Sequence, residues 1–186
     1  MVDDWGQPAQ DMHAEVSAYF ASLEEVASGE ADASALPLLL LSVGQLCGAG
    51  ARLGALVDVV PAERFEPDPG PDPDLERVRE ALRTLLGGLD DYCDLEDPVI
   101  TGEVTRGSLS DDLVAVAADL AHGQEHYLAG RPTEAMWWWQ FSYLSSWGER
   151  AASALRVLHT LLAHVRLDAD DEEVMEAELA ALHAVT

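Results

Sequence analysis

The stretch WWWQFSYLSSWG, from Trp137 to Gly148, holds four of the chain's five tryptophans and directly follows the turn sequence AGRPTEA. An advance of about 100° per residue, as in an α-helix, places its apolar residues on one broad stripe. That stripe is expected to face a core and contains Trp137, Phe141, Leu144, Trp147, Ala151, Leu155, Leu158, Leu162 and Val165. The pattern predicts a helix that is capped by Thr133 and continues to about Leu167, either unbroken or broken near Gly148.

Several aromatic side chains in this helix are expected to lie off the stripe. Trp138 and Trp139 point toward the side of Ser142, and Tyr143 lies on a flank. If the helix is central in a bundle, neighbours on most sides bury these rings, as is usual for Trp. If the rings are partly exposed, they form a groove for a peptide or a partner helix beside small serines. The second interpretation makes Trp138, Trp139, Ser142 and Tyr143 the candidate binding residues.

Apolar spacing predicts four more helices, over residues 11–27, 34–59, 74–91 and 108–128. Gly29 is expected to end the first helix. The helix over 34–59 is apolar nearly all round, which indicates burial, but polar residues leave too few clean apolar positions to span a bilayer. Four glycines in it indicate close approach of another helix, and a homodimer formed through that contact is one alternative: Gly44, Gly48, Gly50 and Gly54.

The remaining segments are expected to be irregular. Residues 61–74 are rich in proline and predict an extended arm, and residues 168–186 predict a short acidic helix or a frayed tail. The loop after Cys93 contains Val99, Ile100 and Val104, which are typical of β-strands, so a short β-hairpin is an alternative to an irregular loop there. Taken together, the segments predict a single all-α domain over residues 1–186. We expect a compact bundle of five or six helices, with the helices over 34–59 and 133–167 central.

The charge of the chain restricts its partners. Lys and Arg number 10 against 35 Asp and Glu, which gives a formal net charge of −25. Such a field repels nucleic-acid phosphates and anionic lipids, so neither is an expected partner. A basic protein or peptide, or a metal ion, is electrostatically favoured, although high net charge also serves solubility alone. Cys47 and Cys93 do not indicate a disulfide framework, and a cytoplasmic location is expected.

The segment around the turn resembles the hairpin of a tetratricopeptide repeat. The matching positions are Gly123, Gly130, Glu134, Ala135, Trp139 and Ser142. His126 departs from that pattern, which prefers Tyr there, and the chain lacks the three repeats that an array needs. The resemblance implies a helical hairpin within a bundle.

Two patterns suggest a metal-dependent hydrolase as the alternative to a non-enzymatic interaction domain. His122, Glu125 and His126 form the sequence HxxEH, in which the two histidines lie one helical turn apart, as two zinc ligands require. Acidic pairs suited to Mg²⁺ are Asp90 with Asp94, and Glu172 or Glu173 with Glu176. The first motif lacks the third ligand and the fold of that peptidase class, so the sequence predicts no catalytic residue and no cofactor.

Three segments together are similar to a family of actinobacterial domains of unknown function. They are the run PLLLLSVGQLCGAGARLGALVDVVPAERFEPDPGPDPD, the run SDDLVAVAADLAHG and the run HYLAGRPTEAMWWWQFSYLSSWGERAASALRVLHTLLAHVRLD. The resemblance covers over half of the chain and implies a helical cytoplasmic protein from a bacterium with a GC-rich genome. It implies no activity and transfers no site residue.

Overall fold

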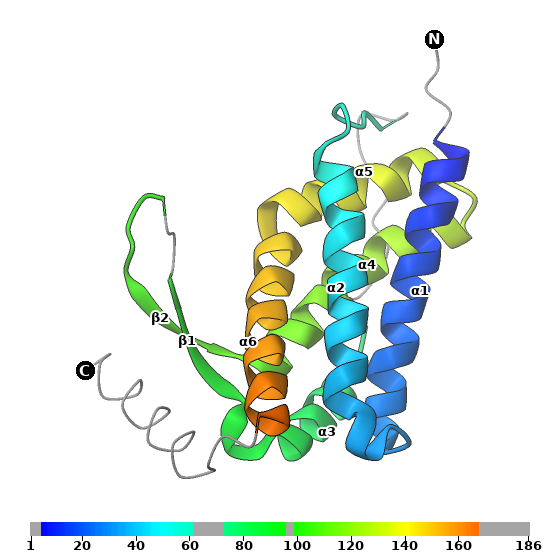
Figure 1. Cartoon of the computed structure of the whole chain (residues 1–186). Helices are drawn as coiled ribbons and strands as arrows, with labels where there is room; N and C mark the ends of the chain where they lie inside the picture. Colours follow the sequence, from blue (N-terminus) through cyan, green and yellow to red (C-terminus); the bar gives the residue numbers. More distant parts are fainter. Residues whose placement is uncertain (1–4, 62–72, 96–98, 168–186) are drawn as a thin grey trace.

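The computed structural model describes residues 5–61, 73–95 and 99–167. Most of the predicted proline-rich arm and all of the acidic tail lie outside these ranges. The described chain is an all-α bundle, as predicted, with helices α1 (Gly6–Ser28), α2 (Ala35–Gly54), α3 (Glu76–Leu86), α4 (Leu109–Leu128), α5 (Pro132–Ser142) and α6 (Gly148–Arg166). In Figure 1, α1, α2 and α6 stand side by side, α5 crosses one end, and α4 passes behind.

Local sequence accounts for several helix boundaries. Gly29 ends α1 in the left-handed conformation, with φ of 82°, which a glycine adopts without steric cost. Ser108 begins α4, and its hydroxyl oxygen accepts a hydrogen bond from the Asp111 amide. The predicted cap of α5 is wrong by two residues, because Arg131 occupies the N-cap and Pro132 the first helical position.

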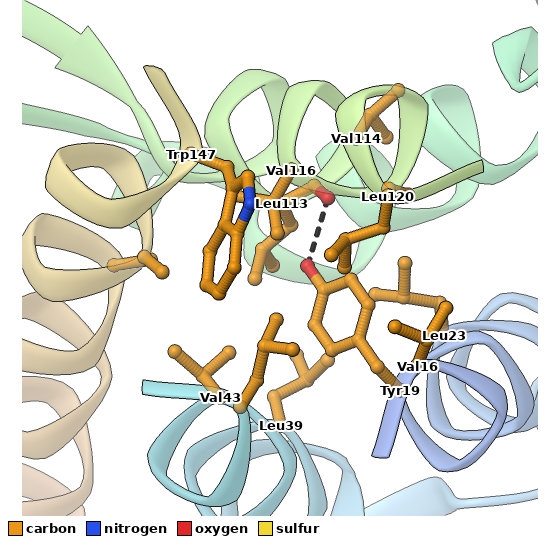
Figure 2. Close-up of a cluster of buried hydrophobic side chains, with 14 of the residues drawn as sticks. Val16, Tyr19, Leu23, Leu39, Val43, Leu113, Val114, Val116, Leu120 and Trp147 are labelled. Carbon is orange, nitrogen blue, oxygen red and sulfur yellow. Dashed lines mark hydrogen bonds between the residues drawn. The ribbon is translucent and has the colours of Figure 1, made fainter. Parts of the chain in front are cut away.

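The core lies where α1, α2, α4 and α6 meet. Figure 2 shows Tyr19 of α1 reaching across it, and its hydroxyl donates a hydrogen bond of 2.8 Å to the Leu113 carbonyl of α4. Burial raises the pKa of Tyr19 far above its usual value, because the phenolate would be poorly solvated there. The phenol is therefore a neutral donor that satisfies one polar group inside an apolar cluster.

Helix α2 makes the predicted close approach at two of its four glycines, whereas Gly44 and Gly48 meet only ordinary contacts. A Cβ at Gly50 would lie 2.5 Å from the rings of both Trp147 and Tyr143, and one at Gly54 would lie 2.8 Å from Tyr143. By length and composition α2 also passes as a membrane span. In this fold α2 packs against α1 and α6, which places its buried apolar face in the core.

Helix α2 ends at Gly54, five residues before the predicted end, and a buried side chain holds the chain that follows. Gln140 of α5 accepts a hydrogen bond of 2.8 Å from the Val59 amide. Its amide nitrogen donates to the carbonyls of Leu53 at 2.9 Å and Val57 at 3.3 Å. These bonds satisfy backbone groups that a helix would have used.

Helices α5 and α6 form one continuous helical segment that contains a π-helical turn, Tyr143–Trp147. The axis bends at this turn in Figure 1. In a regular α-helix, Trp139 and Trp147 would differ by about 80° around the axis, and the extra residue of a π turn reduces this to about 20°. Both rings are fully buried, and Nε1 of Trp147 donates to the Trp139 carbonyl at 3.3 Å.

The structure contains the β-hairpin that the sequence allowed as an alternative to a loop. Strand β1 (Asp91–Leu95) pairs antiparallel with β2 (Val104–Ser108), with Asp91 opposite Ser108 and Leu95 opposite Val104. It projects from the bundle next to α6 (Figure 1). Tyr92 lies across Gly107 on the neighbouring strand, where a Cβ would be 2.5 Å from the ring. Helix α3 and a short 3-10 turn, Gly87–Leu89, lead into it.

Candidate functional site

Helix α5 presents three contacting aromatic rings on its outer side. We call Trp137, Trp138 and Phe141 the aromatic patch. The ring centroids of Trp137 and Phe141 lie 5.5 Å apart in a stacked arrangement, and those of Trp137 and Trp138 lie 5.8 Å apart edge to face. Phe141 is 53% exposed and the two tryptophans are half-buried. Monomeric proteins rarely leave clustered aromatic rings in water, so such a patch marks a candidate interaction surface.

The structure holds the patch in a fixed orientation. Nε1 of Trp138 donates a hydrogen bond of 3.0 Å to the Asp119 carbonyl of α4. The ring of His122, also on α4, contacts the Trp138 ring edge to face at 5.0 Å. Because Trp138 is already anchored, little rotamer entropy remains to be lost when a partner covers it.

The predicted groove residues do not all reach the surface. Trp138 belongs to the aromatic patch and Tyr143 is half-buried, whereas Trp139 and Ser142 are 0% and 4% exposed. Nε1 of Trp139 donates to the Leu120 carbonyl at 3.0 Å, and its indole packs against Gly123 as the predicted helical hairpin requires. Trp139 and Ser142 are therefore core residues rather than contact residues.

The predicted core stripe is also wrong at its start, and its last residue, Val165, is 62% exposed. Phe141 and Leu144 are 53% and 65% exposed. The stripe assumed a regular period across Tyr143–Trp147, where the π turn accommodates one extra residue. Moved back by one position before the turn, the same stripe passes through Met136 and Gln140, which are both buried.

A polar pocket of about 480 Å³ lies between the hairpin, the start of α4 and the start of α6. We call it the hairpin pocket. The hairpin contributes Tyr92, Asp94, Leu95, Thr105, Arg106 and Gly107; α4 and its cap contribute Ser108, Asp111 and Asp112; and the other wall contains Ser145, Ser146, Glu149, Arg150 and Ser153. The sequence does not predict this pocket, because Tyr92 and Asp112 come together only through the packing of the β-hairpin. The one local signal of a polar surface was the presence of three small polar residues on this helical segment, Ser145, Ser146 and Ser153.

Asp112 connects the hairpin to the helices. It is 6% exposed, accepts a hydrogen bond from the Tyr92 hydroxyl and pairs with Arg150 at 2.9 Å. Burial, together with the hydrogen bond and charge of Asp112, raises the pKa of Tyr92 above its usual value. The Tyr92 hydroxyl is therefore protonated at neutral pH and acts as a donor.

Asp94 makes a second connection, between the hairpin and α6. It accepts a hydrogen bond from Ser153 and pairs with Arg156 at 3.0 Å. Burial alone would raise the pKa of the Asp94 carboxyl. The hydrogen bonds from Ser153 and the Leu95 amide, with the charge of Arg156, outweigh burial and lower that pKa below its usual value.

The aromatic patch and the hairpin pocket are neighbours along one helical segment. The Ser145 hydroxyl donates to the Phe141 carbonyl at 2.8 Å, and Ser145 lines the pocket. The Ser146 hydroxyl donates a hydrogen bond of 2.6 Å to the Asp119 carboxylate. The backbone carbonyl of Asp119 accepts the hydrogen bond from the Trp138 indole. The two features therefore share supporting groups and form one continuous candidate site.

The residues proposed for metal chemistry do not assemble. In the described part of the chain, no group of three or more His, Cys, Asp or Glu side chains is placed to hold a metal ion. His122 packs on Trp138, and His126 is buried at 3% exposure. Asp90 accepts from Ser108 and Ser110 at the start of α4, away from the partners of Asp94. Glu172, Glu173 and Glu176 lie outside the described residues.

Comparisons with known proteins concern the fold and the family. A search of curated proteins finds no match to this chain. The fold is similar to the crystal structure of protein BF1032 from Bacteroides fragilis, with a TM-score of 0.67 and 18% identity over 84% of this chain and 92% of that chain. At that identity the likeness concerns the fold alone. A model of the domain-of-unknown-function family DUF5063 matches residues 3–164. The chain therefore belongs to the DUF5063 family, whose function is unknown.

Proposed function

We propose that this protein is a non-enzymatic interaction domain that binds a short segment of a partner protein at the aromatic patch. The observation that carries the proposal is the contact of Trp137, Trp138 and Phe141 with one another on the surface of α5. Tryptophans often dominate binding energy, because large rings bury much area and lose few rotamers. The proposed contact surface differs from the predicted groove by a fraction of a helical turn. It retains Trp138 as a contact residue but no longer includes Trp139, Ser142 and Tyr143.

Charge narrows the partner to a basic segment. The chain carries a formal net charge of −25, so a cationic partner is attracted at long range and an anionic one is repelled. The proposal therefore excludes nucleic acid and anionic membrane surfaces as ligands. It includes a cytoplasmic location and an actinobacterial source, which the sequence resemblance implies. Cell fractionation with an antibody to the native protein tests the location.

Selection from a phage library of short random peptides tests the binding proposal. We expect the selected peptides to share an aromatic or aliphatic residue. Synthetic copies should bind with micromolar dissociation constants and shift the Trp138 indole NMR signal. Phe141→Ala should weaken binding by roughly tenfold or more, as expected for a central contact residue worth at least about 1.4 kcal/mol.

Val165→Ala is the matched control, because Val165 is 62% exposed near the far end of α6. It should bind the same peptides as the unmodified protein. Both variants should keep a melting temperature close to that of the unmodified protein, since each side chain is more than half exposed. Selected peptides that bind equally well to Phe141→Ala would refute the patch as the contact surface.

A further inference from the structure

The hairpin pocket begins where the aromatic patch ends. Phe141 and Glu149 lie on the same helical segment, and a rise of 1.5 Å per residue separates them by roughly 12 Å along its path, which the bend at the π turn makes an upper limit for the direct distance. An extended peptide spans that distance in about three or four residues, at close to 3.3 Å each. A segment whose apolar side chain rests on the patch therefore places a side chain three or four residues away at the pocket.

Four hydroxyl groups of the pocket direct their hydrogens into the protein. Ser145 donates to the Phe141 carbonyl, Ser146 to the Asp119 carboxylate and Ser153 to the Asp94 carboxylate. The Tyr92 hydroxyl likewise donates to Asp112. Each hydroxyl has one hydrogen and two lone pairs, so these four groups offer acceptors to a ligand.

Three of the four carboxylates that line the pocket form ion pairs with arginines, and the fourth is available to a ligand. Asp94 pairs with Arg156, Asp112 pairs with Arg150, and Asp111 pairs with Arg79 and Arg83. Glu149 lines the pocket, is exposed and enters no ion pair with the residues that the structure describes. The remaining positively charged residue of the lining is Arg106. It lies opposite Cys93 in the strand register, and side chains at this position leave the β-hairpin on the face opposite to that of Tyr92.

We propose that the hairpin pocket binds an arginine side chain of the same partner segment, with Glu149 as its counter-ion. A guanidinium offers five N–H donors in a fixed fork, which suits several hydroxyl acceptors and one carboxylate. This inference rests on the proposed function and specifies its ligand. The recognised segment carries an apolar anchor and an arginine about three or four residues apart.

The test uses the selected peptides and their citrulline copies, in which a neutral urea group replaces the guanidinium at the same length. We expect the selected peptides to contain arginine at the stated spacing. Replacement by citrulline should weaken binding to the unmodified protein by roughly fivefold, the range of a solvent-accessible charge pair. Glu149→Gln should bind the arginine and citrulline peptides equally.

Glu25→Gln on α1 is the control, because it removes the same charge from an exposed position on another helix. It should keep the preference for arginine over citrulline, which separates a local contact from the effect of net charge. Peptides that depend on Phe141 but do not distinguish arginine from citrulline would overturn this inference and leave the proposed function standing. Peptides that require arginine and Glu149 but bind equally to Phe141→Ala would refute the aromatic patch instead.

Discussion

Gly123 and the indole of Trp139 share one space between two helices: a Cβ at position 123 would lie 2.3 Å from Nε1 of Trp139. The turn that joins α4 to α5 contains Gly130 with φ of 75°. Helices α4 and α5 therefore pack closely because position 123 is a glycine, which leaves room for the Trp139 indole. This contact fixes the side of α5 that enters the core and, with it, the side that carries the aromatic patch.

Gly123→Ala should destabilise the protein by about 1–2 kcal/mol. Alanine favours a helix over glycine by about 1 kcal/mol, but overpacking a closed contact costs roughly 1–3 kcal/mol. The clash is expected to dominate, because the Trp139 indole is fully buried and bonded to the Leu120 carbonyl. Denaturant unfolding measures the change. Gly88→Ala is the control, since a Cβ there meets nothing within 4 Å; equal stability of both variants would show that Trp139 moves aside freely.

Gln140→Leu should lower the free energy of unfolding by on the order of 2–3 kcal/mol. The substitution leaves the Val59 amide and the carbonyl of Leu53 without their side-chain partner in a buried setting. Hydrogen exchange at the Val59 amide should also become faster, because its acceptor is gone. The exposed Gln45→Leu on α2 should change neither quantity appreciably. A Val59 amide that stays protected would mean that the segment is held by packing alone.

Tyr92→Phe should loosen the β-hairpin. The Tyr92 hydroxyl donates to buried Asp112, and its loss removes one of the two groups that hold this carboxylate. We expect a loss of about 1–3 kcal/mol and faster proteolysis near the hairpin tip at Val99, which is 91% exposed. Tyr143→Phe provides the control, because its hydroxyl makes no hydrogen bond within the described ranges. Unchanged cleavage of Tyr92→Phe would assign hairpin docking to Asp94 and Arg156.

Stability should fall as the pH falls below about 6.5, partly because of His126. Burial lowers the pKa of His126, with a further contribution from Arg131, and the charges of Glu134 and Glu125 oppose this only partly. The unfolded chain therefore takes up this proton first as the pH falls. The stabilisation is intact above the unfolded-state pKa and is lost below it, at no more than about 1.4 kcal/mol per pH unit.

His126→Gln should flatten this dependence between about pH 7 and 5, measured by urea unfolding at several pH values. The exposed His159→Gln should keep the slope of the unmodified protein. Loss of stability at still lower pH has another source: the folded-state pKa of Asp94 is lowered, so its contribution disappears as that carboxylate is protonated. A slope unchanged by His126→Gln would contradict the assignment.

The features of the fold that the sequence predicted have local determinants. The spacing of Val16, Tyr19 and Leu23 and the stop at Gly29 predicted α1. A cap at Ser108 or Ser110, followed by two aspartates, predicted the start of α4, and the structure has the cap at Ser108. The fold class and the α4–α5 hairpin followed from such signals. All of these features depend on residues within a few turns of one another.

The candidate site was only partly predictable, because its decisive features are not local. The π turn changed the direction of every side chain before it, so Phe141 was expected on the core stripe but is exposed. Trp139 was expected off that stripe, either buried by neighbouring helices or in the groove, and it is fully buried. The hairpin pocket depends on the hydrogen bond between Tyr92 and Asp112, which lie on different elements. Periodicity along one helix contains no information about such a pair.

The π turn at Tyr143–Trp147 also governs how related chains should be aligned. A relative that lacks one residue here would form an uninterrupted α-helix whose two halves face as they do in this chain. A relative of equal length without the π turn would instead have its upstream half rotated by about 100°, and the residues aligned with Met136 and Gln140 would leave the interior. A single-residue gap at this point in an alignment therefore signals the same buried positions on α5, whereas an ungapped regular helix signals a reorganised surface.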